Sequence, residues 1–344
     1  MTHSAASEPS VQQPLLETAL TRLIGCRVPI IVAPMFLVSN IEMVVAGSEA
    51  GAIGSFPALN ARPVETLREW LQEIKRRTSH PFAVNLIVNR TNIYLRQQME
   101  ICLEEKVPVI IASLGDPTKL IQLAHEVGSR VFCDVIFEEH AKKAVDAGAD
   151  ALIAVSAGAG GHGGQISPFV WIPYLKRTFG IPIIAAGGIA DGAGLAAALA
   201  LGADGVSIGT RFIASRECPV TADYKQAILN ARPEDIVTTY KLDGVPANVI
   251  ATDYVKKMGT ELSWLEKRLQ KSKKIRQMLM AVRTFRSMRL LEKAAHRTTW
   301  KQLWGAGQVS GLIGDILPVS EIIKNIVKEY ESVRLGLPQQ DKNS

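Results

Sequence analysis

Eight short, mainly apolar segments alternate with longer amphipathic segments through the first two thirds of the chain. The apolar segments are Ile30–Ala33, Ala52–Ser55, Phe82–Ile87, Val109–Ala112, Arg130–Cys133, Ala151–Val155, Ile183–Ala186 and Gly205–Ile208. Nearly continuous apolar runs are typical of strands that are buried on both faces of a parallel sheet and connected by helices. Eight such steps favour a closed (β/α)8 TIM barrel over an open doubly wound sheet, which usually needs fewer strands.

The connections and the C-terminal third have helical patterns. Helices are predicted over Pro63–Arg77, Asn92–Glu105, Pro117–Val127, Glu138–Ala147, Phe169–Phe179 and Gly192–Leu201. After Arg232 the alternation stops and the chain is expected to become helical, because apolar residues from Leu262 to Leu291 recur mostly every three or four positions. We therefore predict an α/β barrel over 15–232. An inserted basic α-helical cap, or substrate domain, is expected over 233–312, and a C-terminal helix returning to the barrel over 313–335.

Composition excludes several classes of protein. With 344 residues, 47% of them hydrophobic and 21% charged, the chain is neither disordered nor collagen-like. No apolar run approaches the roughly 18 residues of a transmembrane helix, and the polar start does not resemble a signal peptide, so a cytoplasmic protein is expected. The four cysteines are widely spaced, which predicts buried thiols and neither a metal site nor a disulfide framework.

The net charge of +6 is concentrated in one segment. Between Lys256 and Lys301 there are 14 Lys and Arg against three Glu. Three interpretations stay open for this segment: the solvated face of an amphipathic cap, a surface that attracts an anionic substrate or an acidic acyl-carrier protein, or a membrane-surface contact. Few aromatic residues are interleaved with the basic ones, so no nucleic-acid partner is expected.

Glycines follow the last two predicted barrel strands. Gly187 and Gly188 end the seventh strand, and Gly209 and Thr210 end the eighth. In this barrel the loops after strands 7 and 8 are the usual phosphate site, because glycines let backbone N–H groups approach an anion. We therefore predict a phosphate-bearing ligand here. The alternative is that these glycines serve only tight turns.

A second glycine-rich loop follows the sixth strand and contains His162. Its G-x-G-x-x-G match at Gly158, Gly160 and Gly163 lacks the acidic residue about 20 positions later that a dinucleotide fingerprint requires. A histidine in a mobile loop almost without side chains can approach a substrate, and an ordinary imidazole pKa near ~6.5 suits a general base. A loop polar group, or a hydrogen-bond donor without proton transfer, is the alternative role.

A further motif match has no catalytic meaning. The G-x-S-x-G pattern at Gly205, Ser207 and Gly209 has the form of a hydrolase nucleophile elbow. Ser207, however, lies within a predicted apolar strand and not on a strand-to-helix turn. A serine hydrolase is therefore not expected.

Taken together, several motifs resemble the nitronate monooxygenases, formerly called 2-nitropropane dioxygenases. They are Pro29–Met35, Asn85, Ala159–Gly164, Ala186–Ile189, Gly209–Phe212 and the late Trp304–Gln308 followed by Gly311–Ile313. The resemblance covers nearly the whole chain. The sequence departs from the pattern of many relatives at Val155 and Gly158, where Gln or Glu is common.

The resemblance implies a cofactor, a reaction and residue roles. FMN is the implied cofactor, and the implied reaction oxidises alkyl nitronates, or nitroalkanes deprotonated by His162, with O2 to a carbonyl compound and nitrite. His162 matches the catalytic histidine. The implied cofactor-binding residues, together with neighbouring strand-end and loop candidates, are Ala33, Pro34, Met35, Asn85, Asp134, Gly160, Gly161, Gly187, Gly188, Ser207, Gly209 and Thr210.

Two other functions stay open at this point. An FMN-dependent NAD(P)H enoyl reductase that acts on acyl-carrier or polyketide-bound chains shares the barrel and the Gly-Gly-His loop. A flavin- or phosphate-binding subunit without turnover is the other. The physiological substrate, the use of NAD(P)H and homo-oligomerisation are not determined by the sequence.

Overall fold

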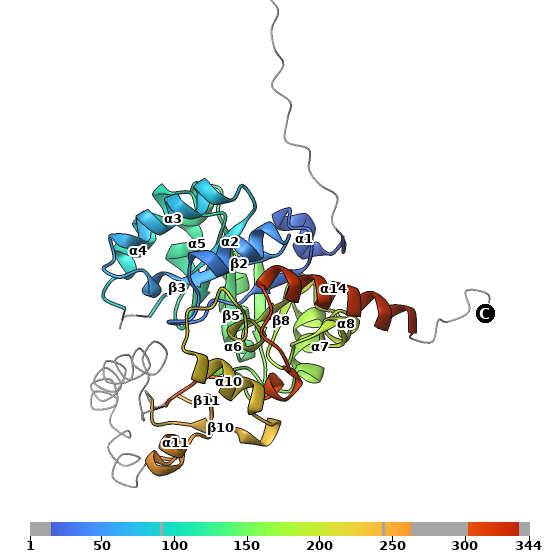
Figure 1. The fold of residues 1–344 in the computed structure, drawn as a ribbon. Helices are drawn as coiled ribbons and strands as arrows, with labels where there is room; N and C mark the ends of the chain where they lie inside the picture. Colours follow the sequence, from blue (N-terminus) through green and yellow to red (C-terminus); the bar gives the residue numbers. More distant parts are fainter. Residues whose placement is uncertain (1–14, 90–91, 243–244, 263–301, 337–344) are drawn as a thin grey trace, which may run out of the picture.

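Eight parallel strands close into a barrel in the computed structural model, which describes residues 15–89, 92–242, 245–262 and 302–336. The ring runs β1-β2-β3-β4-β5-β6-β8-β9, so the predicted (β/α)8 TIM barrel is confirmed. The strands are β1 (Ile30–Val32), β2 (Ile53–Pro57), β3 (Phe82–Ile87), β4 (Val109–Ser113), β5 (Arg130–Val135), β6 (Ala151–Val155), β8 (Ile183–Ala186) and β9 (Gly205–Ile208). Figure 1 shows the helices around this ring.

Helices occupy the connections between the strands. They are α2 (Ile41–Glu49), α3 (Thr66–Arg77), α4 (Leu95–Glu104), α5 (Thr118–Glu126), α6 (Glu138–Asp146), α7 (Pro168–Thr178), α8 (Gly192–Ala200) and the short α9 (Thr210–Ile213). The six predicted helices all form, with shifted ends, and α2 was not predicted. Side-chain caps begin several of them; for example, the Asp191 carboxylate accepts a hydrogen bond from the Gly194 amide at 2.8 Å.

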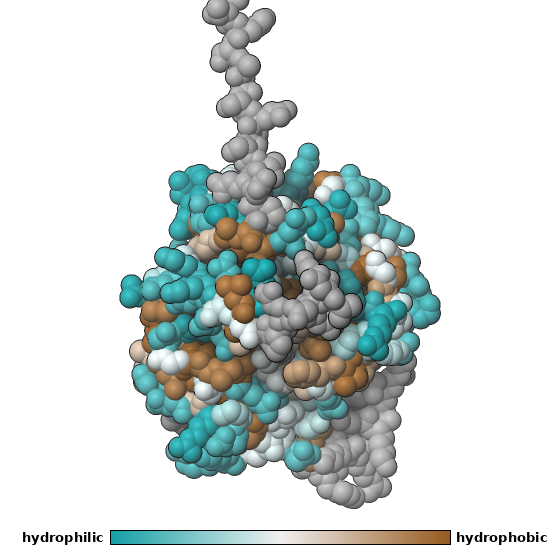
Figure 2. Space-filling view, turned by 90° about the vertical axis from the view of Figure 1, so that its right-hand side faces the viewer, coloured by the Kyte–Doolittle hydropathy of each residue, from teal (hydrophilic) through white to brown (hydrophobic). Residues whose placement is uncertain are grey.

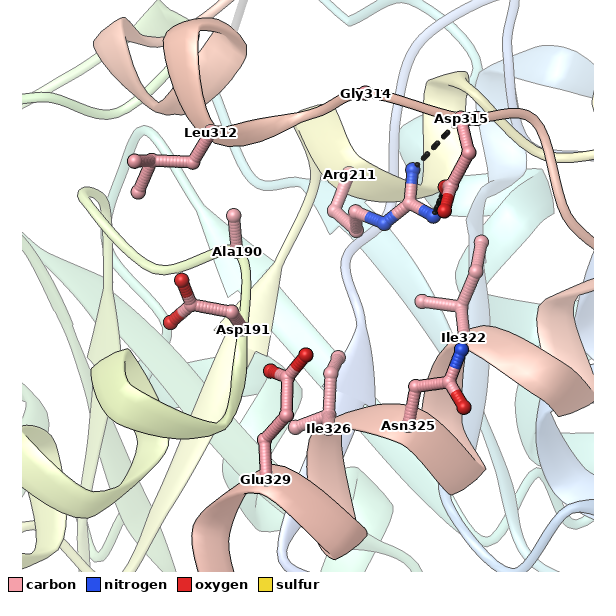
Figure 3. A pocket seen from close by; sticks show the side chains of 10 residues that line it. All are labelled: Ala190, Asp191, Arg211, Leu312, Gly314, Asp315, Ile322, Asn325, Ile326 and Glu329. Atoms are coloured by element: carbon pink, nitrogen blue, oxygen red, sulfur yellow. Dashed lines mark hydrogen bonds and ion pairs between the residues drawn. The ribbon is translucent and has the colours of Figure 1, made fainter. Parts of the chain in front are cut away.

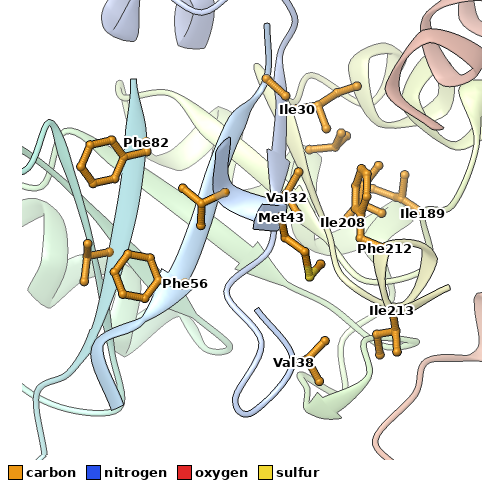
Figure 4. Packing of buried hydrophobic residues seen from close by; sticks show 14 of the residues in the cluster. Ile30, Val32, Val38, Met43, Phe56, Phe82, Ile189, Ile208, Phe212 and Ile213 are labelled. Atoms are coloured by element: carbon orange, nitrogen blue, oxygen red, sulfur yellow. The ribbon is translucent and has the colours of Figure 1, made fainter. Parts of the chain in front are cut away.

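The barrel strands separate two apolar clusters because successive side chains of a strand point to opposite faces. Ile31 belongs to the inner cluster with Ile53 and Phe132, whereas Ile30 and Val32 belong to the outer cluster between barrel and helices. Figure 4 shows part of the outer cluster around Met43 and Phe56. Each large side chain buried in this way contributes about 1.5–3 kcal/mol to folding, which is why both faces must be covered.

The N-terminal end of the barrel is filled by α1 (Ala19–Ile24). Leu20, fully buried on this helix, packs into the inner cluster, and an added Cβ on Gly205 would lie only 2.4 Å from its Cδ2 atom. In Figure 1, α1 lies at the opposite end of the molecule from β10 and β11. This leaves the C-terminal ends of the strands as the end where a ligand can enter.

After the barrel, the chain forms a small antiparallel sheet. β10 (Ile236–Thr239) pairs with β11 (Ala247–Ile250), and β11 pairs with β7 (Gly161–His162), which comes from the glycine-rich loop. The expectation that the chain is helical from Arg232 onward is wrong for these residues. Their β-branched side chains favour extended backbone over helix.

The remaining helices flank this sheet and the barrel. They are α10 (Ala222–Asn230), α11 (Asp253–Met258) and α14 (Val319–Gly336), and α14 packs against α8 and α2. The predicted apolar stripe from Leu262 to Leu291, apart from Leu262 itself, lies outside the described residues. Most of the basic segment between Lys256 and Lys301 lies outside them as well.

The cysteine side chains lie inside the protein, and its surface is of mixed polarity. All four cysteines are buried and free, and burial raises the pKa of the Cys26, Cys102 and Cys133 thiols to about 12. Figure 2 shows apolar patches interrupted by hydrophilic side chains on one face. Within the described ranges, no helix has the length and apolar character needed to cross a membrane.

Candidate functional site

The loop after β8 forms one wall of the barrel mouth with backbone alone. Gly187 and Gly188 both have positive φ, +98° and +79°, a conformation that side chains disfavour. A Cβ on Gly187 would lie 2.9 Å from the Ala159 nitrogen and the Ser156 oxygen, whereas a Cβ on Gly188 would meet nothing closer than 4.0 Å. Gly187 thus packs beneath the His162 loop, and Gly188 faces open space.

The end of β9 lies beside the end of β1. A Cβ on Gly209 would lie 3.5 Å from Met35 Sδ and 3.7 Å from Ala33 Cβ. Pro34 lies between these two half-buried residues, and Ser207 is buried within β9. Within the described ranges, the amides of Gly188 and Gly209 donate no hydrogen bond to the chain. Two neighbouring loops therefore offer backbone donors at the same end of the barrel.

A chain of polar side chains crosses the ends of β3, β4 and β5. Asn85 is buried and donates from Nδ2 to Ser113 Oγ at 2.7 Å and to the Ile111 carbonyl at 3.0 Å. The Ser113 hydroxyl in turn donates to the Asp134 carboxylate. Burial raises the pKa of Asp134 to about 6, while the hydrogen bond from Ser113 opposes this rise. The two predicted residues are thus connected through Ser113.

His162 is exposed and lies on the edge strand β7. Its partner across the sheet is Ala247, and Gly161 pairs with Asn248. The loop is therefore held by strand pairing, in contrast to the mobile loop that its composition suggests. Asn248 adds a side-chain contact, because its Nδ2 donates to the Ala159 carbonyl at 2.7 Å while its Oδ1 accepts from Thr238 Oγ1 at 2.6 Å.

The segment Trp304–Gly307, which we call the strap, supports the same loop from outside. A Cβ on Gly160 would lie 2.8 Å from Ala306 and Gly307 backbone atoms, so only glycine allows this approach. The Gly307 amide donates to Thr210 Oγ1 at 3.0 Å, which leaves the Thr210 hydroxyl hydrogen available as a donor.

A buried tyrosine holds the strap in place. The Tyr224 hydroxyl donates to the Gly305 carbonyl, and its ring stacks on Trp304 with centroids 5.4 Å apart. Burial raises the pKa of Tyr224 strongly, so this hydroxyl stays a donor. Through these contacts α10 positions the strap, and the strap positions the His162 loop.

The structure thus groups the predicted residues by barrel region. Ala33, Met35 and Gly209 meet at β1 and β9, Gly187 and Gly188 lie beneath the His162 loop, and Asn85 and Asp134 belong to the polar chain. The sequence alone did not indicate roles for Ser113, Asn248 or Tyr224. The position of Ser113 at a strand end was a usable signal, whereas Asn248 required recognition of β11.

A small cavity near α14 lies apart from these groups. It has a volume of about 110 Å³ and is lined by Arg211, Asp315, Asp191 and Glu329 among others (Figure 3). These polar groups already have partners: Arg211 binds Asp315, and Glu329 accepts a hydrogen bond from the Gly192 amide at 2.9 Å. The cavity is therefore part of the packing interface between α8 and α14.

A family model described as nitronate monooxygenase matches residues 89–329, which is more than half of the chain. The chain belongs to the nitronate monooxygenase family. The resemblance found in the sequence is thereby confirmed. Members and relatives of this family are oxidoreductases, so this chain is an enzyme of the flavin-type oxidoreductase class.

The chain is similar to proteins that carry different names. A Mycobacterium tuberculosis protein named (3aS,4S,5R,7aS)-5-hydroxy-7a-methyl-1-oxo-octahydro-1H-indene-4-carboxyl-CoA dehydrogenase is 31% identical, over 91% of this chain and 95% of its own. Nitronate monooxygenase from Pseudomonas aeruginosa is 31% identical over 65% of this chain and 77% of its own. FabK from Thermotoga maritima superposes with a TM-score of 0.80 at 34% identity, covering 93% of this chain and 98% of that structure.

The mouth of this barrel fits a phosphate-bearing cofactor. Phosphate is bound in such barrels by backbone amides after strands 7 and 8 and by a short helix. Here the amides of Gly188 and Gly209, which have no acceptor among the described residues, and the Thr210 hydroxyl occupy those positions. An added side chain on Gly188 would project into the open space that the phosphate requires.

Proposed function

We propose that the protein binds FMN across the barrel mouth and that His162 moves a proton at a carbon next to a strongly electron-withdrawing group. The observation that carries the proposal is the placement of His162. This exposed residue lies on β7, in the loop whose Ser156–Ala159 part packs on Gly187 and Gly188 and is held by Asn248 and the strap. When bound, a flavin supplies the redox step of such a reaction.

Each predicted residue has a place in this proposal. Gly188, Gly209 and Thr210 would bind the FMN phosphate, with Ser207 and Gly187 supporting their loops. Asn85 and Asp134 would contact the ring system at the opposite side of the mouth. Residues Ala33, Pro34, Met35, Gly160 and Gly161 would line the cofactor.

Alkyl nitronates and nitroalkanes are the first substrate candidates. A nitro group makes the adjacent C–H acidic, so a neutral imidazole can remove that proton near neutral pH. The products expected with O2 are a carbonyl compound and nitrite. The family match and the Pseudomonas aeruginosa nitronate monooxygenase support this candidate.

Thioesters are the second candidate class, and the extent of similarity favours them. The relative named as a carboxyl-CoA dehydrogenase matches 91% of the chain, whereas the nitronate monooxygenase matches 65% at the same identity. A thioester carbonyl also acidifies the adjacent carbon, so His162 would have the same task. The enoyl reductase expected as an alternative from the sequence belongs to this class, with the proton moving in the opposite direction.

A spectroscopic titration without oxygen separates these candidates. The visible spectrum of the purified protein is recorded while an alkyl nitronate, NADH or NADPH, or an acyl-CoA is added to separate samples. Bleaching by the nitronate alone supports the first candidate. Bleaching by NADH, NADPH or the acyl-CoA, without bleaching by the nitronate, supports the second. A protein that cannot take up FMN contradicts the cofactor assignment.

A further inference from the structure

A groove of about 870 Å³ lies on the rim of the barrel mouth, over the connections that follow β3 and β4 and the first turns of α5. Volumes of about 300–1,000 Å³ are typical of small-molecule sites. None of the residues assigned above to FMN or to the support of His162 lines this groove. It therefore offers room for a part of the substrate that the proposed site does not use.

The groove adjoins the polar chain of the mouth. Val88 follows the last residue of β3, and Leu114 follows Ser113 at the end of β4. In the ring of eight strands, β3 and β4 lie opposite β8 and β9. A ligand that extends from His162 across the mouth, away from the phosphate loops, would leave the barrel over this groove.

One wall of the groove is apolar and strained. Leu114 is 51% exposed and has φ +61°, a backbone conformation that leucine rarely adopts. An exposed leucine held in this conformation costs folding free energy without gaining burial. Val88 extends the apolar wall beside it. Both features are explained if an apolar part of a ligand covers Leu114.

The other wall is polar with no net charge. Lys119 and Gln122 are exposed on α5, and the described part of the chain gives neither side chain a hydrogen bond or ion pair. Asp116 is already engaged, since its carboxylate accepts hydrogen bonds from Thr118 N at 3.0 Å and Thr118 Oγ1 at 2.6 Å. Among the described residues, the groove thus combines an apolar wall with the Gln122 amide and the Lys119 ammonium, neither of which has a partner there.

We propose that this groove binds the pantetheine arm of a thioester substrate, which rests on the thioester candidate above. Pantetheine itself is an uncharged, extended chain with two amides and a dimethyl branch, and in both sources its far end is attached to a phosphate. The dimethyl group suits Leu114 and Val88, the amides suit Gln122, and the phosphate suits Lys119. Coenzyme A and acyl-carrier proteins share this arm, so either can be its source.

Kinetics with matched substrates tests the proposal in the holoenzyme. The same acyl group is presented on coenzyme A and on N-acetylcysteamine, which lacks most of the arm. Leu114→Gly removes the wall at a position where glycine is unstrained, and Lys119→Glu reverses the charge. Each is expected to raise KM for the coenzyme A ester about tenfold and to leave the N-acetylcysteamine ester unchanged. Lys328→Glu on α14 is the matched control.

Equal effects on both esters, or no effect on either, would overturn the groove assignment. Binding of free coenzyme A, measured by calorimetry, covers the case in which the enzyme turns over neither ester and the thioester function itself fails. Binding that both variants weaken supports the groove, whereas absent or unaffected binding contradicts it. A lower KM for the acyl-carrier ester than for the coenzyme A ester would identify a carrier as the source of the arm.

Discussion

In the barrel every strand is paired on both sides, whereas His162 lies on an edge strand of two residues in the small sheet. Most barrel strands are buried along their whole length, while β10 and β7 are largely accessible. Closure and burial make the barrel the stable part of the molecule. The small sheet depends on a few hydrogen bonds and on the strap.

This difference separates two tasks. The loops after β8 and β9 offer backbone N–H donors at fixed positions, and this suits a cofactor that stays bound. In the proposed function the small sheet carries His162, the residue that would contact the substrate, and the fold tolerates modest changes in the position of this sheet. Changes in the sheet should therefore alter turnover while flavin binding and folding persist.

His162→Ala gives the largest expected effect in the sheet. Turnover with nitronate or thioester should fall by about 10²–10⁴-fold, the usual contribution of a general base. Flavin content and the melting temperature should stay the same, because the side chain is exposed and the β7–β11 pairing uses backbone atoms. His140→Ala, an exposed histidine on α6, is the control. Unchanged turnover in His162→Ala would remove this residue from the mechanism.

The barrel could be predicted from sequence because its signal is repeated and local. Segments such as Ala151–Val155 and Ile183–Ala186 are continuously apolar, and their observed limits match the predicted ones. The strands β10 and β11 are short, and only pairing with Gly161 and His162 completes their sheet. Contacts between segments about 85 positions apart leave no local pattern.

Only part of the candidate site can be seen in the sequence. Glycines after strands and an isolated histidine can be seen in the sequence, because each is a property of a single loop. The support of that histidine is not visible, because Asn248 and Tyr224 act through the carbonyls of Ala159 and Gly305, far away in the sequence. Ser113 was visible as a strand end, but its role depends on contacts with two other strands.

Asn248→Ala should produce an intermediate effect. It removes the 2.7 Å hydrogen bond to the Ala159 carbonyl and the contact with Thr238, while the backbone pairing of β11 remains. Loss of one positioning contact is expected to lower kcat about tenfold, with flavin content unchanged. Asn230→Ala at the end of α10 is the matched control. Loss of flavin in Asn248→Ala would show that the small sheet also supports the cofactor, against the division of tasks above.

The smallest expected effect is on the pH dependence of stability, and it tests the role of Asp134 in the barrel. Burial raises the pKa of Asp134 to about 6, so the folded state favours the protonated carboxyl. Its contribution to the free energy of unfolding is complete below about pH 4 and is lost as the pH rises through about 6. Asn cannot ionise. The stability of Asp134→Asn relative to the unmodified protein should therefore rise by about 2 kcal/mol between pH 4 and pH 7.

Thermal unfolding at matched flavin occupancy measures this difference. Ser113→Ala sharpens the test, because the Ser113 hydrogen bond lowers the pKa of Asp134. Without that bond the carboxyl should ionise at higher pH, and the loss of stability should shift to higher pH with it. A stability difference between Asp134→Asn and the unmodified protein that does not vary with pH would mean that Asp134 is ionised in the folded barrel. The polar chain would then bring a negative charge, and not a neutral hydrogen-bonding group, to the mouth.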